Sequence, residues 1–152
     1  FGGGCELSLS CDLRLMQSNA LIGLTETSLA IIPGAGGCVR LPRLIGSAKA
    51  KEMILLSKRL SAEEALHCGL VHQIAEPKDF LKARENLLGQ LLNNGPLALQ
   101  AAKLAIDGSE DLPLMEALQH ESDCYEKIIP TSDRLEALVA FSEKRKPKFT
   151  GN

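Results

Sequence analysis

The segments FGGGCELSLSC, residues 1–11, and GLTETSLAIIPGAGG, residues 23–37, decide the fold. Three consecutive glycines precede an apolar run in the first segment, and this order predicts a tight turn into a helix over Gly3 to about Cys11. Glycine combines freedom at positive φ with room for close backbone approach. Small serines separate the apolar residues, so we expect this helix to be buried almost all round.

The same two segments hold a candidate site. The first turn of a helix presents unpaired N–H groups and partial positive charge, so the N–H of Gly3 is suited to stabilise a carbonyl oxygen that becomes anionic. Glu6 lies three residues further on and therefore on the same helix face. Glu26 offers a second carboxylate, and Gly34 lies in the glycine-rich loop that follows it. Taken singly, each glutamate has a plainer interpretation as a solvated surface residue.

Further motifs follow in order along the whole chain, and together they resemble the crotonase superfamily, more narrowly the enoyl-CoA hydratases. The residues that carry the likeness are Gly2-Gly3-Gly4-Cys5-Glu6, Cys11-Asp12, Gly23 to Glu26, Ile32 to Gly37 with Arg40-Leu41-Pro42-Arg43, Ser61-Ala62 with Ala65 and Gly69-Leu70-Val71, and Asp133-Arg134 with Ala140-Phe141 and Glu143-Lys144-Arg145. The chain departs from close relatives at Cys38-Val39, where they carry Thr-Gln, and this departure bears on the orientation of Glu26.

The resemblance implies an enzyme that adds water across the C2=C3 double bond of a 2-enoyl-CoA thioester. Glu6 would activate the water, Glu26 would protonate C2, and the N–H of Gly3 would be one of two oxyanion donors. The N–H of Gly34 would help to fix the water or the substrate. No metal and no cofactor are implied, because CoA is part of the acyl-CoA substrate. Retention of both acids favours hydration over isomerisation.

The resemblance also implies an α/β fold, namely the C-terminal part of a crotonase-type ββα spiral core followed by a helical oligomerisation subdomain. We place the core with its catalytic loops at residues 1–94 and the helical subdomain at residues 95–152. A homo-oligomer, a trimer or a dimer of trimers, is implied, in which Tyr125 and Lys144 reach the CoA of a neighbouring subunit. A plainer interpretation of Lys144 is a solvated basic tail.

The hydrophobic pattern predicts three short strands and seven further helices. Pro and Gly residues divide the second half of the chain into helices, and Ser47 and Ser61 are candidate N-caps. The expected strands are 12–16, 21–23 and 71–74, and the expected helices are 35–44, 47–56, 61–69 with Gly69 as the terminating residue, 78–93, 96–106, 112–128 and 132–144, with a break at Gly108.

Composition limits the other function classes. The net charge of −2 and the pI near 5.9 give no electrostatic footprint for nucleic acid, and no apolar run is long enough for a membrane span. Five cysteines without a C-x-x-C pair are typical of reduced thiols. An RNA-binding or catalytically silent paralogue and an enoyl-CoA isomerase stay as alternatives. Because the chain opens at Phe1 inside a motif, we interpret it as the C-terminal portion of a larger protein, and the resemblance implies a mitochondrial location.

Overall fold

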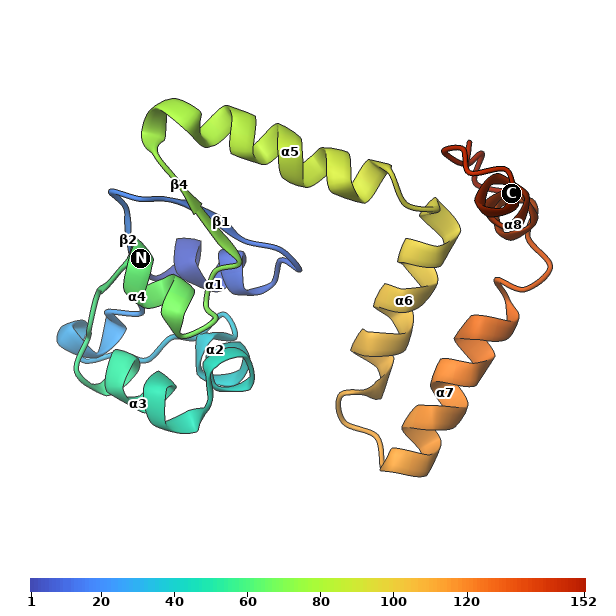
Figure 1. The fold of residues 1–152 in the computed structure, drawn as a ribbon. Coiled ribbons are helices and arrows are strands. Elements are labelled where there is room, and N and C mark those ends of the chain that lie inside the picture. The colour runs from blue at the N-terminus through green and yellow to red at the C-terminus, as the bar shows by residue number, and fades with distance from the viewer. The chain divides into compact units, whose positions relative to one another are not determined.

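A computed structural model describes residues 1–152, and these form two compact units, Phe1–Arg84 and Glu85–Asn152 (Figure 1). The division falls within helix α5, Phe80–Leu92, and so before the boundary between residues 94 and 95 that the sequence suggests. That boundary stays a prediction about folding domains. No helix of the chain is both long enough and apolar enough to cross a lipid bilayer.

The first unit combines short helices with two small sheets. Strands β1 and β4 pair in parallel, with Met16 opposite Ile74, and β2 and β3 pair antiparallel, with Ile22 opposite Leu60. Its elements are α1 Gly3–Leu9, β1 Leu15–Gln17, β2 Leu21–Ile22, the 3₁₀-helix η1 Glu26–Leu29, α2 Gly37–Ile45, α3 Ser47–Leu55, β3 Leu60–Ser61, α4 Ala62–His67, β4 Gln73–Ala75 and the 3₁₀-helix η2 Pro77–Asp79.

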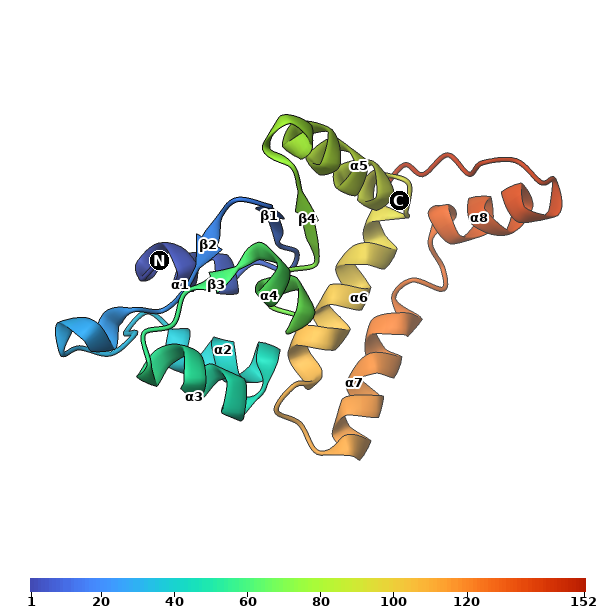
Figure 2. The same cartoon turned by 60° about the vertical axis from the view of Figure 1, so that its left-hand side comes forward.

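One apolar core holds the first unit together. Helices α2 and α3 pack against each other, and α1 packs on α2 (Figure 2). The largest side chains of this core are almost fully excluded from solvent, and they come from loops, helices and strands alike: Leu24, Leu41, Met53, Leu60 and Leu70. Burying such side chains stabilises the fold by about 1.5–3 kcal/mol each, so the core fixes the loops that lead to Glu26 and to α2.

Two N-terminal helix predictions need correction. Helix α1 ends at Leu9 and is buried on one side only, since Leu7 is 70% exposed while Cys5, Glu6 and Leu9 are buried. Ser47 does not cap α3, because Gly46 occupies the N-cap position and no side chain bonds there. The Ser61 prediction is confirmed, with Ser61 and Glu64 forming a reciprocal capping box at the start of α4.

The second unit contains the helices α6 Pro96–Ser109, α7 Leu114–Glu126 and α8 Ser132–Ser142. Helices α6 and α7 form an antiparallel hairpin (Figure 1). The predicted break at Gly108 is wrong, since α6 runs through it. A Cβ at Gly108 would meet Nε2 of the His120 ring, so a larger residue there would displace that ring. His120 in turn contacts the carbonyl of Leu104 at 3.0 Å.

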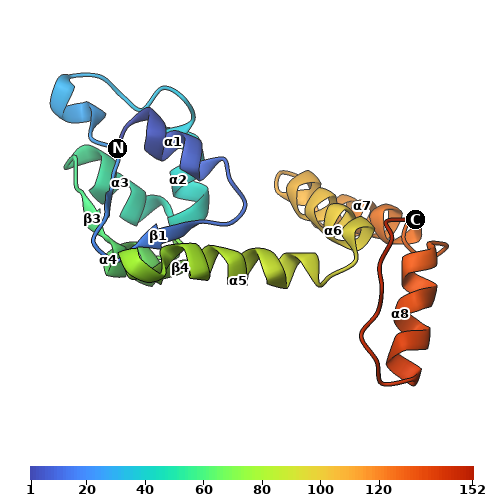
Figure 3. The same cartoon turned by 90° about the horizontal axis from the view of Figure 1, so that it is seen from above.

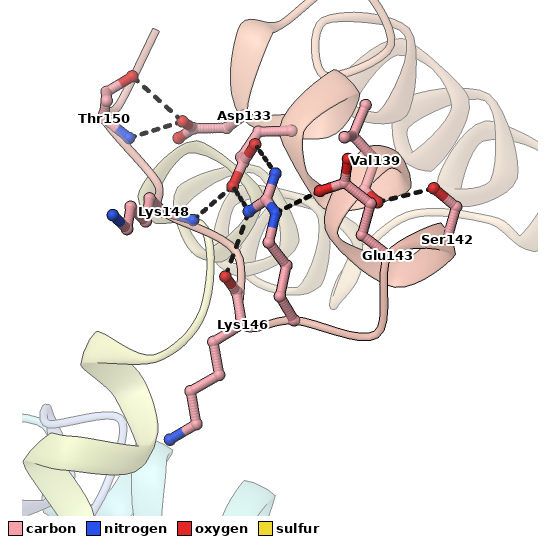
Figure 4. Close-up of polar contacts among 9 residues, drawn as sticks. Asp133, Val139, Ser142, Glu143, Lys146, Lys148 and Thr150 are labelled. Atoms are coloured by element: carbon pink, nitrogen blue, oxygen red, sulfur yellow. Dashed lines mark hydrogen bonds and ion pairs between the residues drawn. The ribbon is translucent and has the colours of Figure 1, made fainter.

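The C-terminal tail folds back along α8 (Figure 3). Asp133 is 5% exposed and accepts hydrogen bonds from the N–H groups of Thr150 (2.7 Å) and Gly151 (2.9 Å). Glu136 binds the Arg145 guanidinium through both oxygens and also accepts the N–H of Lys148 at 2.8 Å. Figure 4 shows Thr150 directed at Asp133. The backbone of Lys148 lies near these two residues in the same view. Two carboxylates of α8 therefore hold the tail.

Attachment of the C-terminal tail to α8 should weaken at acid pH. The hydrogen bonds from Arg145 and then from the Lys148 N–H lower the pKa of Glu136 from 4.5 to about 2. Because this pKa is lower in the folded state, the stabilisation is complete above pH 4.5 and is lost as the pH falls through about 2. The amide chemical shift of Lys148 should titrate with that low midpoint, and Glu136→Gln should abolish the titration. A midpoint near 4.5 would contradict the prediction.

Candidate functional site

Glu6 is a buried carboxylate held by two backbone N–H groups. It lies on α1 and is only 4% exposed, and its Oε1 accepts the N–H of Ala35 at 2.8 Å and the N–H of Gly37 at 2.8 Å. Both bonds fall on Oε1, so Oε2 is the oxygen with lone pairs left for another partner. Hydrogen bonds to a buried carboxylate fix its position.

The loop before α2 is shaped to provide these two donors. Gly36 has φ 101°, a conformation that favours glycine, and Arg40 Nη1 donates to the Ala35 carbonyl at 3.0 Å. That carbonyl is thereby directed away from Glu6 while the N–H of Ala35 faces it. Gly37 is needed for close approach, since a Cβ there would lie 2.9 Å from Glu6 Oε1 and 2.8 Å from Leu24 Cδ1.

Glu26 is the first residue of the 3₁₀-helix η1 and is half-buried. Its Oε2 is excluded from solvent and has no hydrogen-bond partner in the chain. Its Oε1 lies 3.7 Å from the position that a Cβ at Gly2 would take, so the carboxylate reaches the start of α1. A buried carboxylate oxygen without a donor is unusual and indicates a functional role.

The backbone is exposed to solvent at both Gly3 and Gly34. Gly2 precedes α1 with φ 58°, and a Cβ at Gly3 would meet no atom within 4 Å. At Gly34 the nearest atom to such a Cβ would be the Ile32 carbonyl oxygen, 3.9 Å away. The first helical N–H bond of α1 runs from Glu6 to the Gly2 carbonyl, so the N–H groups ahead of Glu6 have no acceptor within the helix.

Cys5 shows that the two glutamates share one neighbourhood. The thiol is 2% exposed, and its pKa is raised first by burial and then by the negative charges of Glu26 and Glu6. Gly3 and Glu6 lie with Cys5 on α1, and Glu26 Oε1 reaches the start of that helix, while the grouping of these residues into one catalytic site stays a prediction. Reasoning from sequence missed the donors Ala35 and Gly37, although the glycine-rich loop was a signal for close approach.

Tyr125 and Lys144 lie in the second unit. Tyr125 is on α7 and is 62% exposed. Lys144 follows α8, is exposed, and has the positive φ of 53°, while its N–H bonds the Phe141 carbonyl at 3.2 Å. Both side chains are available to a partner molecule.

The family model for enoyl-CoA hydratase/isomerase matches residues 1–152, and the chain belongs to that family. Its fold is that of the C-terminal part of a crotonase. A crystal structure of an enoyl-CoA hydratase from Bacillus anthracis matches with a TM-score of 0.97 and 48% identity over 99% of this chain and 58% of that one.

Two curated relatives are similar over nearly the whole chain. A putative enoyl-CoA hydratase/isomerase from Bacillus subtilis is 49% identical over 99% of this chain and 58% of its own length. The mitochondrial methylglutaconyl-CoA hydratase of Homo sapiens is 46% identical over 99% of this chain and 45% of its own length. The chain thus spans about half the length of the relatives it matches.

Proposed function

We propose that the protein carrying this chain hydrates a 2-enoyl-CoA thioester through Glu6 and Glu26. One observation supports this above the others: two carboxylates lie around the buried Cys5, one fixed by two backbone N–H groups and the other with a buried oxygen that has no partner. Such a pair can share one water, with one group accepting a proton and the other donating one.

The proposed reaction uses one water and leaves the enzyme's total proton count unchanged. The thioester carbonyl oxygen accepts the N–H of Gly3 and develops negative charge, which makes C3 electrophilic. Glu6 takes a proton from the water as the water oxygen bonds to C3, and Glu26 gives a proton to C2. The backbone bonds to Glu6 Oε1 hold its other oxygen toward the water, and the N–H of Gly34 helps to fix water or substrate.

Isomerisation is the second candidate, because the family and the Bacillus subtilis relative are both described as hydratase/isomerase. An isomerase moves a proton between C4 and C2 and needs no water. The full-length protein should be incubated with crotonyl-CoA in oxygen-18 water. Hydration places the label in the C3 hydroxyl. Movement of the double bond without label would contradict the proposal.

The names of the relatives suggest candidates for the acyl group and for the location of the protein. Methylglutaconyl-CoA is one candidate substrate, since a 46% identical relative carries that name, and a short straight-chain enoyl-CoA is another. Several relatives are named as mitochondrial, and others come from bacteria. We propose a mitochondrial location on the basis of the relatives that are named as mitochondrial. The net charge of −2 and the pI near 5.9 give no electrostatic footprint for RNA.

We further propose that a trimer or a dimer of trimers brings Tyr125 and Lys144 to the CoA of a neighbouring subunit. The apolar side chains exposed on α7 and α8 support an assembly, among them Leu114, Met115, Leu118, Leu135, Leu138 and Phe141. Lys144→Ala should raise KM for the CoA substrate and leave the sedimentation coefficient unchanged. Leu138→Glu should dissociate the oligomer and raise KM as well. A fully active Leu138→Glu monomer would exclude the link between assembly and activity.

A further inference from the structure

The two glutamates of the site are held in different ways. Glu6 is fixed directly by two N–H donors, whereas Glu26 Oε2 has no hydrogen-bond partner. The Glu26 side chain starts from the backbone of η1, of which Glu26 is the first residue. Whatever holds η1 in place therefore contributes to the position of that carboxylate.

A chain of hydroxyl groups joins η1 to the end of α3. Thr27 Oγ1 donates to the Ile54 carbonyl at 2.6 Å, so its single proton is committed there. Ser57 Oγ lies 2.7 Å from Thr27 Oγ1 and, with Thr27 donating to Ile54, can donate to that oxygen; the carbonyl oxygen of Thr25, 3.5 Å away, is its other acceptor. The remaining lone pairs of Ser57 Oγ accept the N–H of Ser28 at 3.1 Å. From donor to acceptor, the hydrogen bonds run from the Ser28 N–H through the hydroxyls of Ser57 and Thr27 to the Ile54 carbonyl.

Ser57 occupies a position that normally suits glycine. Its φ is +49°, and it ends α3 with two bonds typical of a Schellman motif: Ser57 N–H to Ile54 at 3.2 Å and Lys58 N–H to Met53 at 2.8 Å. Helix α4 ends with the same pair of bonds but places Gly69, φ +78°, at the equivalent position. A serine is strained there and a glycine is not. Only the serine, however, supplies a hydroxyl to η1.

We infer that Ser57 is a positioning residue for Glu26, acting through Thr27 and the 3₁₀-helix η1. The inference rests on the proposed function, because it assigns Ser57 to the orientation of the proposed proton donor. Ser57 touches neither the substrate nor the reacting water. Its hydroxyl holds the turn that aims the carboxylate.

Ser57→Gly in the full-length protein separates this role from a structural one. The glycine removes the hydroxyl and relieves the positive φ, so the midpoint of chemical denaturation should stay unchanged or rise. The kcat for crotonyl-CoA hydration should fall about 10-fold or more with KM unchanged, because a small misplacement of a reacting group slows the chemical step. In a Glu26→Gln background the same change should cause no further loss of kcat.

Matched variants complete the test. Thr27→Val removes the next hydroxyl of the chain and should lower kcat like Ser57→Gly, whereas Thr27→Ser keeps the hydroxyl and should restore it. Ser61→Ala also removes a serine hydroxyl of the first unit and should lower stability without lowering kcat. An unchanged kcat in Ser57→Gly, or an equal loss with and without Glu26, would overturn the inference alone. Absence of hydration in the unmodified protein would instead overturn the proposed function.

Discussion

Replacing Glu6 by Gln in the full-length protein should lower kcat for enoyl-CoA hydration by about 10²–10⁴-fold, with little change in KM. The amide keeps the size of the side chain, and its oxygen still accepts the N–H groups of Ala35 and Gly37, but it cannot take a proton from water. Glu26→Gln should have an effect of similar size, since the amide cannot act as the acid at C2. The measurement is steady-state kinetics with crotonyl-CoA and with methylglutaconyl-CoA.

The double variant distinguishes a pair from two independent residues. In the proposed mechanism both carboxylates act on one water, so removal of the second should add less than its separate effect. Circular dichroism and the denaturation midpoint of each single variant show that the fold is kept. Normal turnover of both substrates by both single variants would exclude the hydratase assignment.

Gly37→Ala should damage stability and catalysis together. The backbone of Gly37 does not require glycine by its φ, so the effect comes from space alone. A Cβ would lie 2.7 Å from Pro33 Cβ and 2.9 Å from Glu6 Oε1, and neither the loop nor the buried α1 has room to yield. We expect unfolding free energy to fall by about 1–3 kcal/mol. We also expect kcat to fall by about 10²-fold as Glu6 is displaced.

Gly89→Ala is the matched control for this change. Gly89 lies inside α5, and a Cβ there would meet no atom within 4 Å. Alanine should raise stability by about 0.4–1 kcal/mol because it restricts the unfolded chain and favours helix, and kcat should not change. If Gly37→Ala kept full stability and full kcat, the close packing of the loop on Glu6 would contribute to neither stability nor catalysis.

Local patterns predicted most of the helices and selected Glu6 and Glu26 as candidates for one site. Helix starts and ends depend on neighbouring residues, so Gly3, Pro96 and the Ser61 capping box could be located from sequence. Packing between segments that are far apart in the sequence could not be located in this way. The bond from Gly37 to Glu6 joins residues 31 positions apart, and the passage of α6 through Gly108 depends on a ring from α7. Strand β3 is only two residues long and has no periodicity to read.

The parallel pairing of β1 with β4 also governs when the site can form. Arg14 and His72, next to these strands, are bonded although they are 58 residues apart, and the segment they enclose contains Glu26 and the loop that binds Glu6. Closing a loop of that length slows folding far more than forming a local helical hairpin such as α6–α7. During synthesis β1 can therefore pair with β4 only after Ala75 has emerged from the ribosome, whereas the hairpin can form as soon as its own residues emerge.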